Sequence, residues 1–262
     1  LISIFLLSGC NITKDSMEDI EVYTTIYAIK YLIDSLYGSN STIYSIYPSG
    51  VNTEDFKLSD KKLEEYSKTD LFVFNSLDRD REYAVKMINN NKSLKVIDVS
   101  MGMTYENNIT ELWLNPYNYL MMAENTKNGL LEYIDNPYLI SNSDGTGIEN
   151  RYDELKYNLS RLDADIKESI SLAPNKTIVV DNDMFKYLEK YNLNVISLED
   201  NDNLNENVIY EVKKLIRNGN IKYIYSSSEE TNSICKSLID EYGVSLLTLN
   251  TMESIDGGIT NS

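Results

Sequence analysis

The sequence predicts an α/β protein of two lobes, each a mostly parallel sheet with flanking helices, joined by one long rigid helix. Short β-branched or aromatic runs alternate with segments whose apolar residues recur every three or four positions. This alternation is typical of parallel sheets that are covered by helices on both faces. It stops near residue 134 and restarts near residue 176, and a single long apolar stripe lies between.

The first half of the chain alternates between strand and helix signals. Residues 28–36 place four apolar residues at helical spacing, and Gly38 follows as a stop signal. The predicted strands cover residues 21–27, 41–47, 71–74 and 94–99, and the predicted helices cover 28–36, 60–68, 82–90 and 117–134.

The middle of the chain predicts one long helix over residues 148–172. Its apolar residues follow one another at spacings of three or four: Tyr152, Leu155, Leu159, Leu162, Ile166 and Ile170. At 1.5 Å per residue such a helix measures about 37 Å, enough to span a small molecule. The stripe is too short to favour the competing interpretation, a coiled-coil partner helix.

The second half repeats the alternation without any visible sequence repeat. The predicted strands cover residues 176–180, 194–198, 221–225 and 244–249, and the predicted helices cover 184–191, 206–218 and 231–242. A gap between two such lobes is a natural place for a ligand.

Composition excludes several classes of function. The 262 residues carry a formal net charge of −17, which argues against nucleic acid as a partner and would attract cations. The chain has no histidine, so it lacks the usual general base, the serine triad and the commonest metal ligand. Without a nucleophile motif or a phosphate-binding glycine loop, we expect no enzyme.

The two cysteines have different surroundings and do not suggest a disulfide. Cys10 ends an apolar run that closes with Leu7-Ser8-Gly9-Cys10, which resembles a bacterial lipobox in which Cys10 carries the lipid. We therefore expect a lipid-anchored monomer on the extracytoplasmic face of a bacterial membrane. Cys235 is expected to be a buried thiol on a helix.

Two loops carry the strongest functional signals. Pro48-Ser49-Gly50-Val51-Asn52-Thr53-Glu54-Asp55-Phe56 follows a predicted strand, the position where α/β folds usually bind ligands. The second stretch is Glu111-Leu112-Trp113-Leu114-Asn115-Pro116. An acidic surface turn is the alternative interpretation of the first stretch.

These motifs resemble the substrate-binding lipoproteins of bacterial zinc and manganese ABC importers, a family that also includes proteins named as adhesins. The first loop resembles the family's Pro-x-Gly-x-x-x-His-Asp-Phe, and the second resembles His-x-Trp-Leu-Asp-Pro. Further matches, in the same order as in the family, are residues 21–27, 68–75, 182–188 and 240–243. The resemblance implies two lobes bridged by a rigid helix, with a metal ion held between them and an ABC permease as partner.

The resemblance places the four metal ligands on Glu54, Glu111, Asn182 and Asn250, so the usual ligand histidines are replaced. Two carboxylates and two amide oxygens would suit a hard divalent cation, Mn²⁺ rather than Zn²⁺. The alternative is a degenerate member that binds no metal and acts as a surface adhesin or interaction lipoprotein. Asn182 would then be a helix cap and Asn250 a turn residue.

The expected organisation of the chain follows from these signals. It comprises a signal-peptide remnant with the lipobox (1–10), a tether (11–19), an N-terminal lobe (20–144), a linking helix (145–173) and a C-terminal lobe (174–262), the last of which we expect to be truncated.

Overall fold

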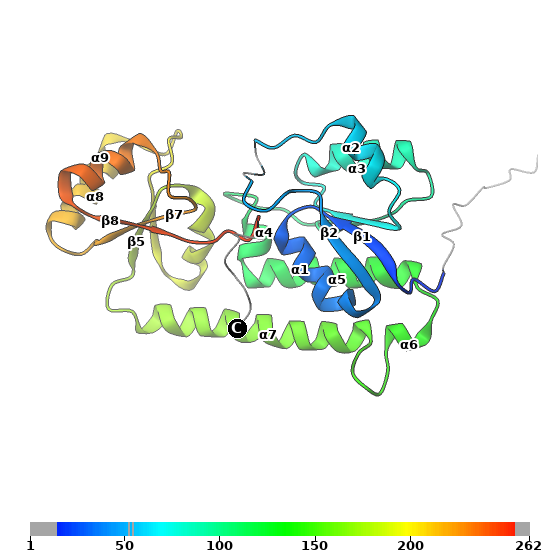
Figure 1. Cartoon of the computed structure of the whole chain (residues 1–262). Helices are drawn as coiled ribbons and strands as arrows, with labels where there is room; N and C mark the ends of the chain where they lie inside the picture. Colours follow the sequence, from blue (N-terminus) through cyan, green and yellow to red (C-terminus); the bar gives the residue numbers. More distant parts are fainter. Residues whose placement is uncertain (1–14, 52, 54, 255–262) are drawn as a thin grey trace, which may run out of the picture.

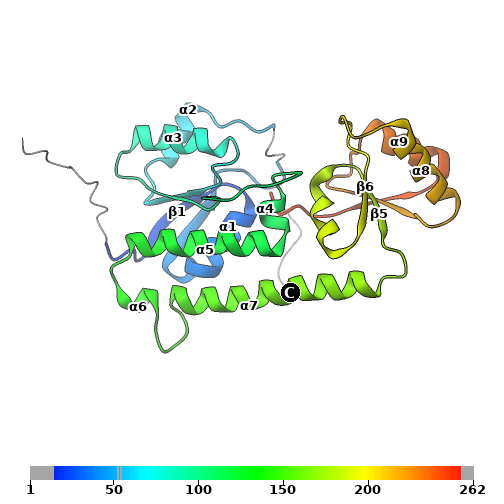
Figure 2. The same ribbon diagram turned by 180° about the vertical axis from the view of Figure 1, so that it is seen from behind.

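The computed structural model describes residues 15–51, 53 and 55–254, and it confirms the predicted fold class. Two α/β lobes lie side by side, and one long helix runs along both of them (Figure 1; Figure 2 shows the molecule from behind). The predicted lipidation site Cys10 and the predicted ligand Glu54 lie outside the described residues.

The first lobe is built on a four-stranded parallel sheet. Its strands lie in the order β2-β1-β3-β4, with bounds Ile20–Thr24 (β1), Ser41–Ser45 (β2), Leu71–Phe74 (β3) and Lys95–Asp98 (β4). In the central register Val22 pairs with Ile43 on one side and with Leu71 on the other. All four residues of β3 are buried, as expected for a parallel strand with both faces covered.

Helices cover both faces of this sheet, with α2 and α3 on one face and α1 and α5 on the other (Figure 1). Asn115 caps α5 through its side chain, and Pro116 occupies the first helical position, where its missing N–H costs nothing. The elements are α1 (Tyr27–Tyr37), the 3₁₀ turn η1 (Gly38–Asn40), α2 (Asp60–Tyr66), α3 (Asp80–Asn90), α4 (Glu111–Leu114), α5 (Pro116–Tyr133) and α6 (Pro137–Ile140).

Helix α5 approaches strand β4 unusually closely at Gly129. A Cβ atom at this position would lie 2.8 Å from two side-chain carbons of Ile97. Real Cβ contacts are almost never this short, so the close packing of α5 on the sheet depends on the missing side chain.

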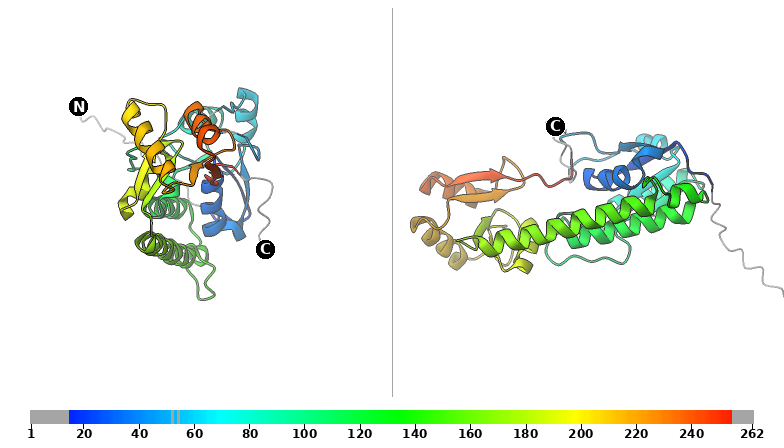
Figure 3. Two further views of the ribbon diagram at one scale, coloured as in Figure 1. Left: turned by 90° about the vertical axis from the view of Figure 1, so that its left-hand side faces the viewer. Right: turned by 90° about the horizontal axis from the view of Figure 1, so that it is seen from below.

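The long helix α7 (Ile148–Leu172) has the bounds predicted from its apolar stripe. The stripe is buried from Ile148 to Leu159, where α7 packs on α5 and α1, but Leu162 is 47% exposed. The second half of α7 extends beyond the first lobe, and Ile170 there packs against the second lobe (Figure 3). No described helix is long and apolar enough to cross a membrane.

The second lobe repeats the topology of the first. Its four strands are all parallel and lie in the order β6-β5-β7-β8, with bounds Thr177–Val180 (β5), Asn194–Ser197 (β6), Tyr223–Ser226 (β7) and Ser245–Thr248 (β8). Helices α8 (Glu206–Arg217) and α9 (Ser233–Tyr242) cover one face. Cys235 is fully buried there, as predicted, and burial raises the pKa of its thiol to about 11.

The other face of this sheet is partly covered by η2 (Asp183–Tyr191), a 3₁₀ helix where the sequence predicts a helix over 184–191. Phe185, Leu188 and Tyr191 are three residues apart, and residues at this spacing eclipse one another in a 3₁₀ helix. The three-residue spacing therefore directs all of them toward one side.

The described part of the predicted tether, residues 15–19, packs against the first lobe instead of extending from it. Met17 is 1% exposed and belongs to the core of that lobe. Asp15 forms a bridge to Ile134, and its backbone N–H donates to the Tyr133 carbonyl at 3.0 Å. Burial of the one large apolar side chain in this stretch explains the difference.

After β8 the chain crosses back to the first lobe as a segment that we call the strap, residues 250–254 (Figure 1). The carbonyls of Met252 and Glu253 accept hydrogen bonds from the backbone N–H groups of Ala28 (2.9 Å) and Tyr27 (3.0 Å). These N–H groups open α1 and have no partner within the helix. The strap thus completes the N-terminus of a core helix of the other lobe.

Candidate ligand-binding cleft

The carboxyl ends of both sheets supply the walls of two adjoining cavities between the lobes. The larger cavity has a volume of about 400 Å³ and the smaller one about 310 Å³. Both are lined by Thr53, Asn108, Met184 and Glu253. Open α/β sheets bind ligands outside the carboxyl ends of their strands, so this cleft is the candidate site.

The larger cavity has walls from both lobes. Thr53 and Asn108 come from loops that follow β2 and β4 of the first lobe. Asn182, Glu199 and Ser227 come from loops that follow β5, β6 and β7 of the second. Residues separated by more than 170 positions therefore face one space.

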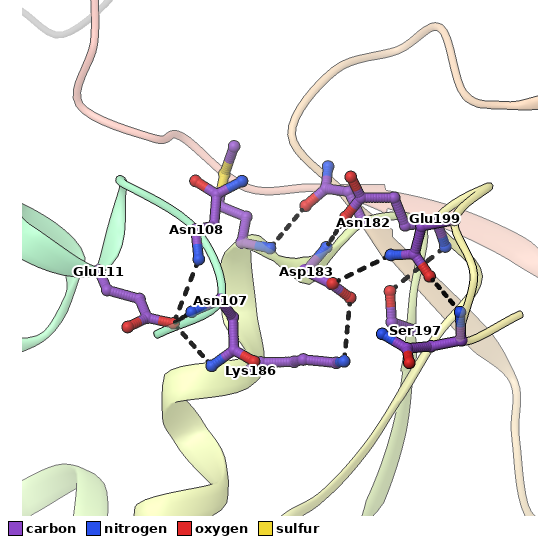
Figure 4. A network of polar contacts seen from close by, with 11 residues as sticks. Asn107, Asn108, Glu111, Asn182, Asp183, Lys186, Ser197 and Glu199 are labelled. Carbon is purple, nitrogen blue, oxygen red and sulfur yellow. Dashed lines mark hydrogen bonds and ion pairs between the residues drawn. The ribbon is translucent and has the colours of Figure 1, made fainter. Parts of the chain in front are cut away.

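Glu111, a predicted metal ligand, is only 5% exposed and is held by its own loop (Figure 4). Its Oε1 accepts hydrogen bonds from the backbone N–H of Asn107 (3.0 Å) and of Asn108 (3.4 Å), and from the Asn107 side-chain amide (2.8 Å). Its Oε2 accepts one from the backbone N–H of Glu106 at 3.2 Å. The carboxylate thus fixes the loop that carries Asn108 into the cleft.

Asn182, the second predicted ligand in the described chain, lines the larger cavity directly. Its Oδ1 caps η2 by accepting from the Met184 N–H at 3.0 Å, and its Nδ2 donates to the Ser227 hydroxyl at 3.3 Å. The side chain is therefore both a helix cap and part of the cavity wall.

Asn250, the third, is exposed and forms a local turn at the start of the strap. Its Oδ1 accepts a hydrogen bond of 2.7 Å from the Met252 N–H. This bond supports the left-handed backbone of Met252, whose φ is 59°. The next residue, Thr251, lines the larger cavity.

The structure thus brings Asn182 itself to the cleft, together with neighbours of the other three predicted ligands. Thr53 precedes Glu54, Asn108 belongs to the loop held by Glu111, and Thr251 follows Asn250. Among the described residues, no group of three or more His, Cys, Asp or Glu side chains is arranged to hold a metal ion.

The sequence analysis did not identify two acidic residues that line the larger cavity. Glu199 follows β6, and its Oε2 accepts from the Asp183 N–H at 2.7 Å. Glu253 lies in the strap, and its carboxylate accepts from the hydroxyls of Thr53 (3.2 Å) and Thr251 (2.8 Å). Both residues follow a predicted parallel strand, and this position could have identified them from the sequence as candidates for the binding site.

Asp183 lies beside Glu199, a residue of the larger cavity's wall (Figure 4). It is 8% exposed, and its carboxylate lies 3.3 Å from the Lys186 Nζ and accepts from the Asn201 amide at 3.2 Å. These contacts hold Asp183 behind Glu199.

The smaller cavity contains a buried carboxyl group. Asp80, the first residue of α3, is 2% exposed and accepts a hydrogen bond of 2.7 Å from the Tyr47 hydroxyl. Burial raises the pKa of Asp80 to about 6, although the hydrogen bond from Tyr47 acts in the opposite direction. Burial and the nearby Asp80 charge also raise the pKa of Tyr47 far above its ordinary value.

Contacts on either side of the cleft join the two lobes. Trp113 is 4% exposed, and its Nε1 donates to the Thr251 carbonyl of the strap at 2.7 Å. Lys190 of η2 donates to the Asn115 Oδ1 at 2.6 Å and to Asp163 of α7 at 3.0 Å. Trp113 therefore lies where the strap meets the first lobe.

Comparison with known proteins extends these observations. A family model described as "Zinc-uptake complex component A periplasmic" matches residues 22–260. The zinc-binding protein AdcA of Streptococcus pyogenes serotype M1 is 22% identical over 293 aligned positions, covering 97% of this chain and 55% of AdcA. The chain spans about half the length of the curated relatives it matches.

Solved structures share the fold. The Zn(II)-bound AdcA of Streptococcus pneumoniae superposes with a TM-score of 0.69 at 20% identity, covering 91% of this chain and 52% of that chain. The metal-dependent lipoprotein YcdH of Bacillus subtilis gives a TM-score of 0.69 at 20% identity, covering 91% of this chain and 90% of that chain.

Proposed function

Because the chain belongs to the family of the periplasmic component A of zinc-uptake complexes, we propose that it is the substrate-binding component of a divalent metal ion ABC importer. The family is one of solute-binding proteins and not of enzymes, in agreement with the expectation from the sequence. In this role the cleft between the lobes holds the cation through oxygen ligands.

One observation carries the proposal. Four loops that the sequence singled out for metal binding come from both lobes, and each contributes a residue to the wall of the larger cavity: Thr53, Asn108, Asn182 and Thr251. Such convergence of segments separated by up to 198 positions is what an interlobe binding site requires.

The proposed ligands are Glu54, Glu111, Asn182 and Asn250. A carboxylate offers about four lone-pair sites, so Glu111 keeps capacity at Oε2, which accepts a single hydrogen bond of 3.2 Å from Glu106. An all-oxygen set favours Mn²⁺ over Zn²⁺, whereas the relatives reported above are named for zinc. A direct competition between the two ions decides the selectivity.

The proposed setting follows from the same family. The protein delivers its ion to the permease of the importer as a monomer, and a lipid on Cys10 holds it at the extracytoplasmic face of the membrane. Replacing Cys10 by Ser would then release the protein from membranes into the soluble fraction.

Titration calorimetry of metal-stripped protein tests the function. We expect heat of binding with Mn²⁺, weaker heat with Zn²⁺, and a rise in melting temperature with either ion. Glu54→Gln and Glu111→Gln should abolish the rise, whereas Glu106→Gln, a change on an exposed neighbour, should leave it intact.

A gain-of-affinity variant strengthens the test. Asn182→Asp retains a capping oxygen for η2 and adds a negative charge to the cavity wall, so it should bind the cation more tightly. Absence of heat with Mn²⁺, Zn²⁺ and Ca²⁺ in the wild type would refute the function.

A second candidate function is that of a surface adhesin or interaction lipoprotein with no metal. The local roles of Glu111 and Asn182, which hold a loop and cap η2, favour it, because those roles need no cation. In that case added Mn²⁺ or Zn²⁺ would leave the melting temperature unchanged, in the wild type and in the variants alike.

A further inference from the structure

Helix η2 joins the wall of the larger cavity to a contact between the lobes. Asn182, its N-terminal cap, and Met184 line that cavity, and Met184 also lines the smaller one. The last two residues of η2, Lys190 and Tyr191, instead contact the first lobe and helix α7. A tilt of η2 would therefore change the cavity and this contact together.

The 3₁₀ geometry of η2 directs Met184 and Lys190 to the same side. A 3₁₀ helix has three residues per turn, so residues six positions apart eclipse after two turns. In an α-helix, with 3.6 residues per turn, the same two side chains would point about 120° apart. One face of η2 thus carries both the cavity residue and the contact residue, about 12 Å apart along the helix axis.

The Lys190 ammonium lies between two acceptors on different elements. Its Nζ donates to the Asn115 Oδ1 of the first lobe at 2.6 Å and to the Asp163 Oδ1 of α7 at 3.0 Å. The Tyr191 hydroxyl donates to the same Asp163 oxygen at 2.6 Å. The hydrogen bonds from Tyr191 and Lys190 lower the pKa of Asp163, so its carboxylate stays charged opposite the ammonium.

Asn115 connects this contact to the opposite wall of the cleft. It is 8% exposed, and its Oδ1 also caps α5 by accepting from the Tyr117 N–H at 3.2 Å. Its backbone N–H donates to the Glu111 carbonyl at 3.3 Å, across the single turn of α4. Glu111 in turn holds the loop that brings Asn108 to both cavities. One short helix therefore separates the contact from the wall of the first lobe.

An apolar contact supports this polar one. Leu114 packs against the core of the first lobe and also against the apolar cluster beside η2 that contains Val180 and Phe185. Apolar packing is not directional, so on its own it allows α4 and η2 to slide past each other. The hydrogen bonds of Lys190 have a preferred distance and angle, and they fix the position of η2 relative to α4.

We infer that Lys190 is a positioning residue of the cleft, which fixes the wall formed by Asn182 and Met184 relative to the wall that carries Asn108. Lys190 is not among the residues that line either cavity, so it acts through η2 and Asn115. Its effect on a bound cation rests on the proposed metal-binding function. Walls that are already fixed lose less conformational freedom on binding, and the affinity for the cation is higher for that reason.

Distances between two spin labels test the position of the walls without any metal. Labels at Asn90→Cys in α3 and Ser237→Cys in α9, both exposed positions, report the separation of the lobes. The background Cys10→Ser leaves the fully buried Cys235 as the one native thiol. We expect a narrow distance distribution with Lys190 present. Lys190→Met, which keeps the length and removes the donors, should broaden it, and Lys190→Arg should restore it because charge and donors remain.

Lys213→Met is the matched control. The Lys213 side chain is 33% exposed, as is that of Lys190, but its ion pair of 3.2 Å is with Glu241 inside the second lobe. It should keep the narrow distribution, and calorimetry should show an Mn²⁺ affinity within about twofold of the wild type. Lys190→Met should weaken Mn²⁺ binding about tenfold, and Lys190→Arg should recover most of the loss.

An unchanged distance distribution in Lys190→Met would overturn the inference, and so would equal Mn²⁺ affinity of Lys190→Met and a wild type that binds the ion. Equal broadening in Lys190→Met and Lys213→Met would also overturn it, because the effect would not depend on the contact between the lobes. If only Lys190→Met broadens the distribution and the wild type gives no heat with Mn²⁺, the metal-binding function fails and the positioning role of Lys190 stands.

Discussion

The side-chain amide of Asn107 donates a hydrogen bond of 2.8 Å to the Glu111 carboxylate, and backbone N–H groups of residues 106–108 donate to the same carboxylate. Glu111 therefore shapes the loop that brings Asn108 to both cavities. This structural role exists whether or not a cation is bound.

Replacing Glu111 by Gln should destabilise the metal-free protein. A neutral amide accepts more weakly than a carboxylate, and its NH₂ group would face N–H donors, so we expect the free energy of unfolding to fall by about 2 kcal/mol. Urea unfolding at pH 7 without metal measures the effect. Glu106→Gln on the same loop should stay within about 0.5 kcal/mol of the wild type; equal losses in both variants would contradict the assigned role.

Asp80 should make stability depend on pH. Its pKa is about 6 in the folded protein against an ordinary value of 3.8, so the folded state favours the protonated form. The stability that Asp80 contributes is present below about pH 4 and is lost as the pH rises through 6. The difference of about two pKa units corresponds to roughly 3 kcal/mol.

The variant Asp80→Asn isolates this contribution, because it resembles the protonated acid and still accepts from Tyr47. Relative to the wild type, its free energy of unfolding should rise between pH 4.5 and pH 8, as measured by urea unfolding at several pH values. Asp78→Asn, at an exposed neighbour whose charge is a minor cause of the raised Asp80 pKa, should keep most of the pH dependence of the wild type, because burial of Asp80 is the largest cause. A constant difference between wild type and Asp80→Asn would exclude the raised pKa.

Gly129→Ala should destabilise the protein although alanine is the better helix former. The added Cβ would meet Ile97 at 2.8 Å, and overpacking of this kind costs about 1 to 3 kcal/mol. Thermal or urea unfolding measures the loss. Adding Ile97→Val should recover part of it by removing a methyl group from the contact.

The exposed neighbour Asn128 provides the control for helix propensity. Asn128→Ala, also in α5, should raise the free energy of unfolding by a few tenths of a kcal/mol. If Gly129→Ala behaved in the same way, α5 would not approach β4 as closely as described.

Trp113→Phe should weaken the attachment of the strap. The substitution removes the 2.7 Å hydrogen bond to the Thr251 carbonyl and leaves a smaller ring in a buried site. We expect a loss of about 2 kcal/mol in urea unfolding followed by circular dichroism. Tyr117→Phe, at a 63% exposed side chain, should have no measurable effect.

The fold was predictable because its signals are periodic. The apolar stripe of α7 gave the bounds Ile148–Leu172, and the fully apolar run Leu71–Phe74 is the buried strand β3. Sequence periodicity does not reveal where a lobe ends, however. Leu162 continues the stripe yet is 47% exposed, because α7 has by then passed the first lobe.

The site was less predictable because side-chain roles depend on partners distant in sequence. The family motifs predicted Glu111 and Asn182 as site residues. They did not predict the hydrogen bonds that the side chains of these two residues make within the protein. Asn75 ends the family match over residues 68–75 and Arg79 belongs to no motif, and only the packed structure shows that both line a cavity with Asn108. The position of both residues after β3 is a further local signal that could have directed attention to them.

The strap has a consequence for biogenesis. The carbonyls of Met252 and Glu253 complete the start of α1, which begins at Tyr27. The first helix that the structure describes therefore depends on residues more than two hundred positions later in the chain. During vectorial synthesis or export, the first lobe can reach its finished state only after β8 and the strap have emerged. Maturation of the two lobes is therefore obligatorily linked, even though each has its own hydrophobic core.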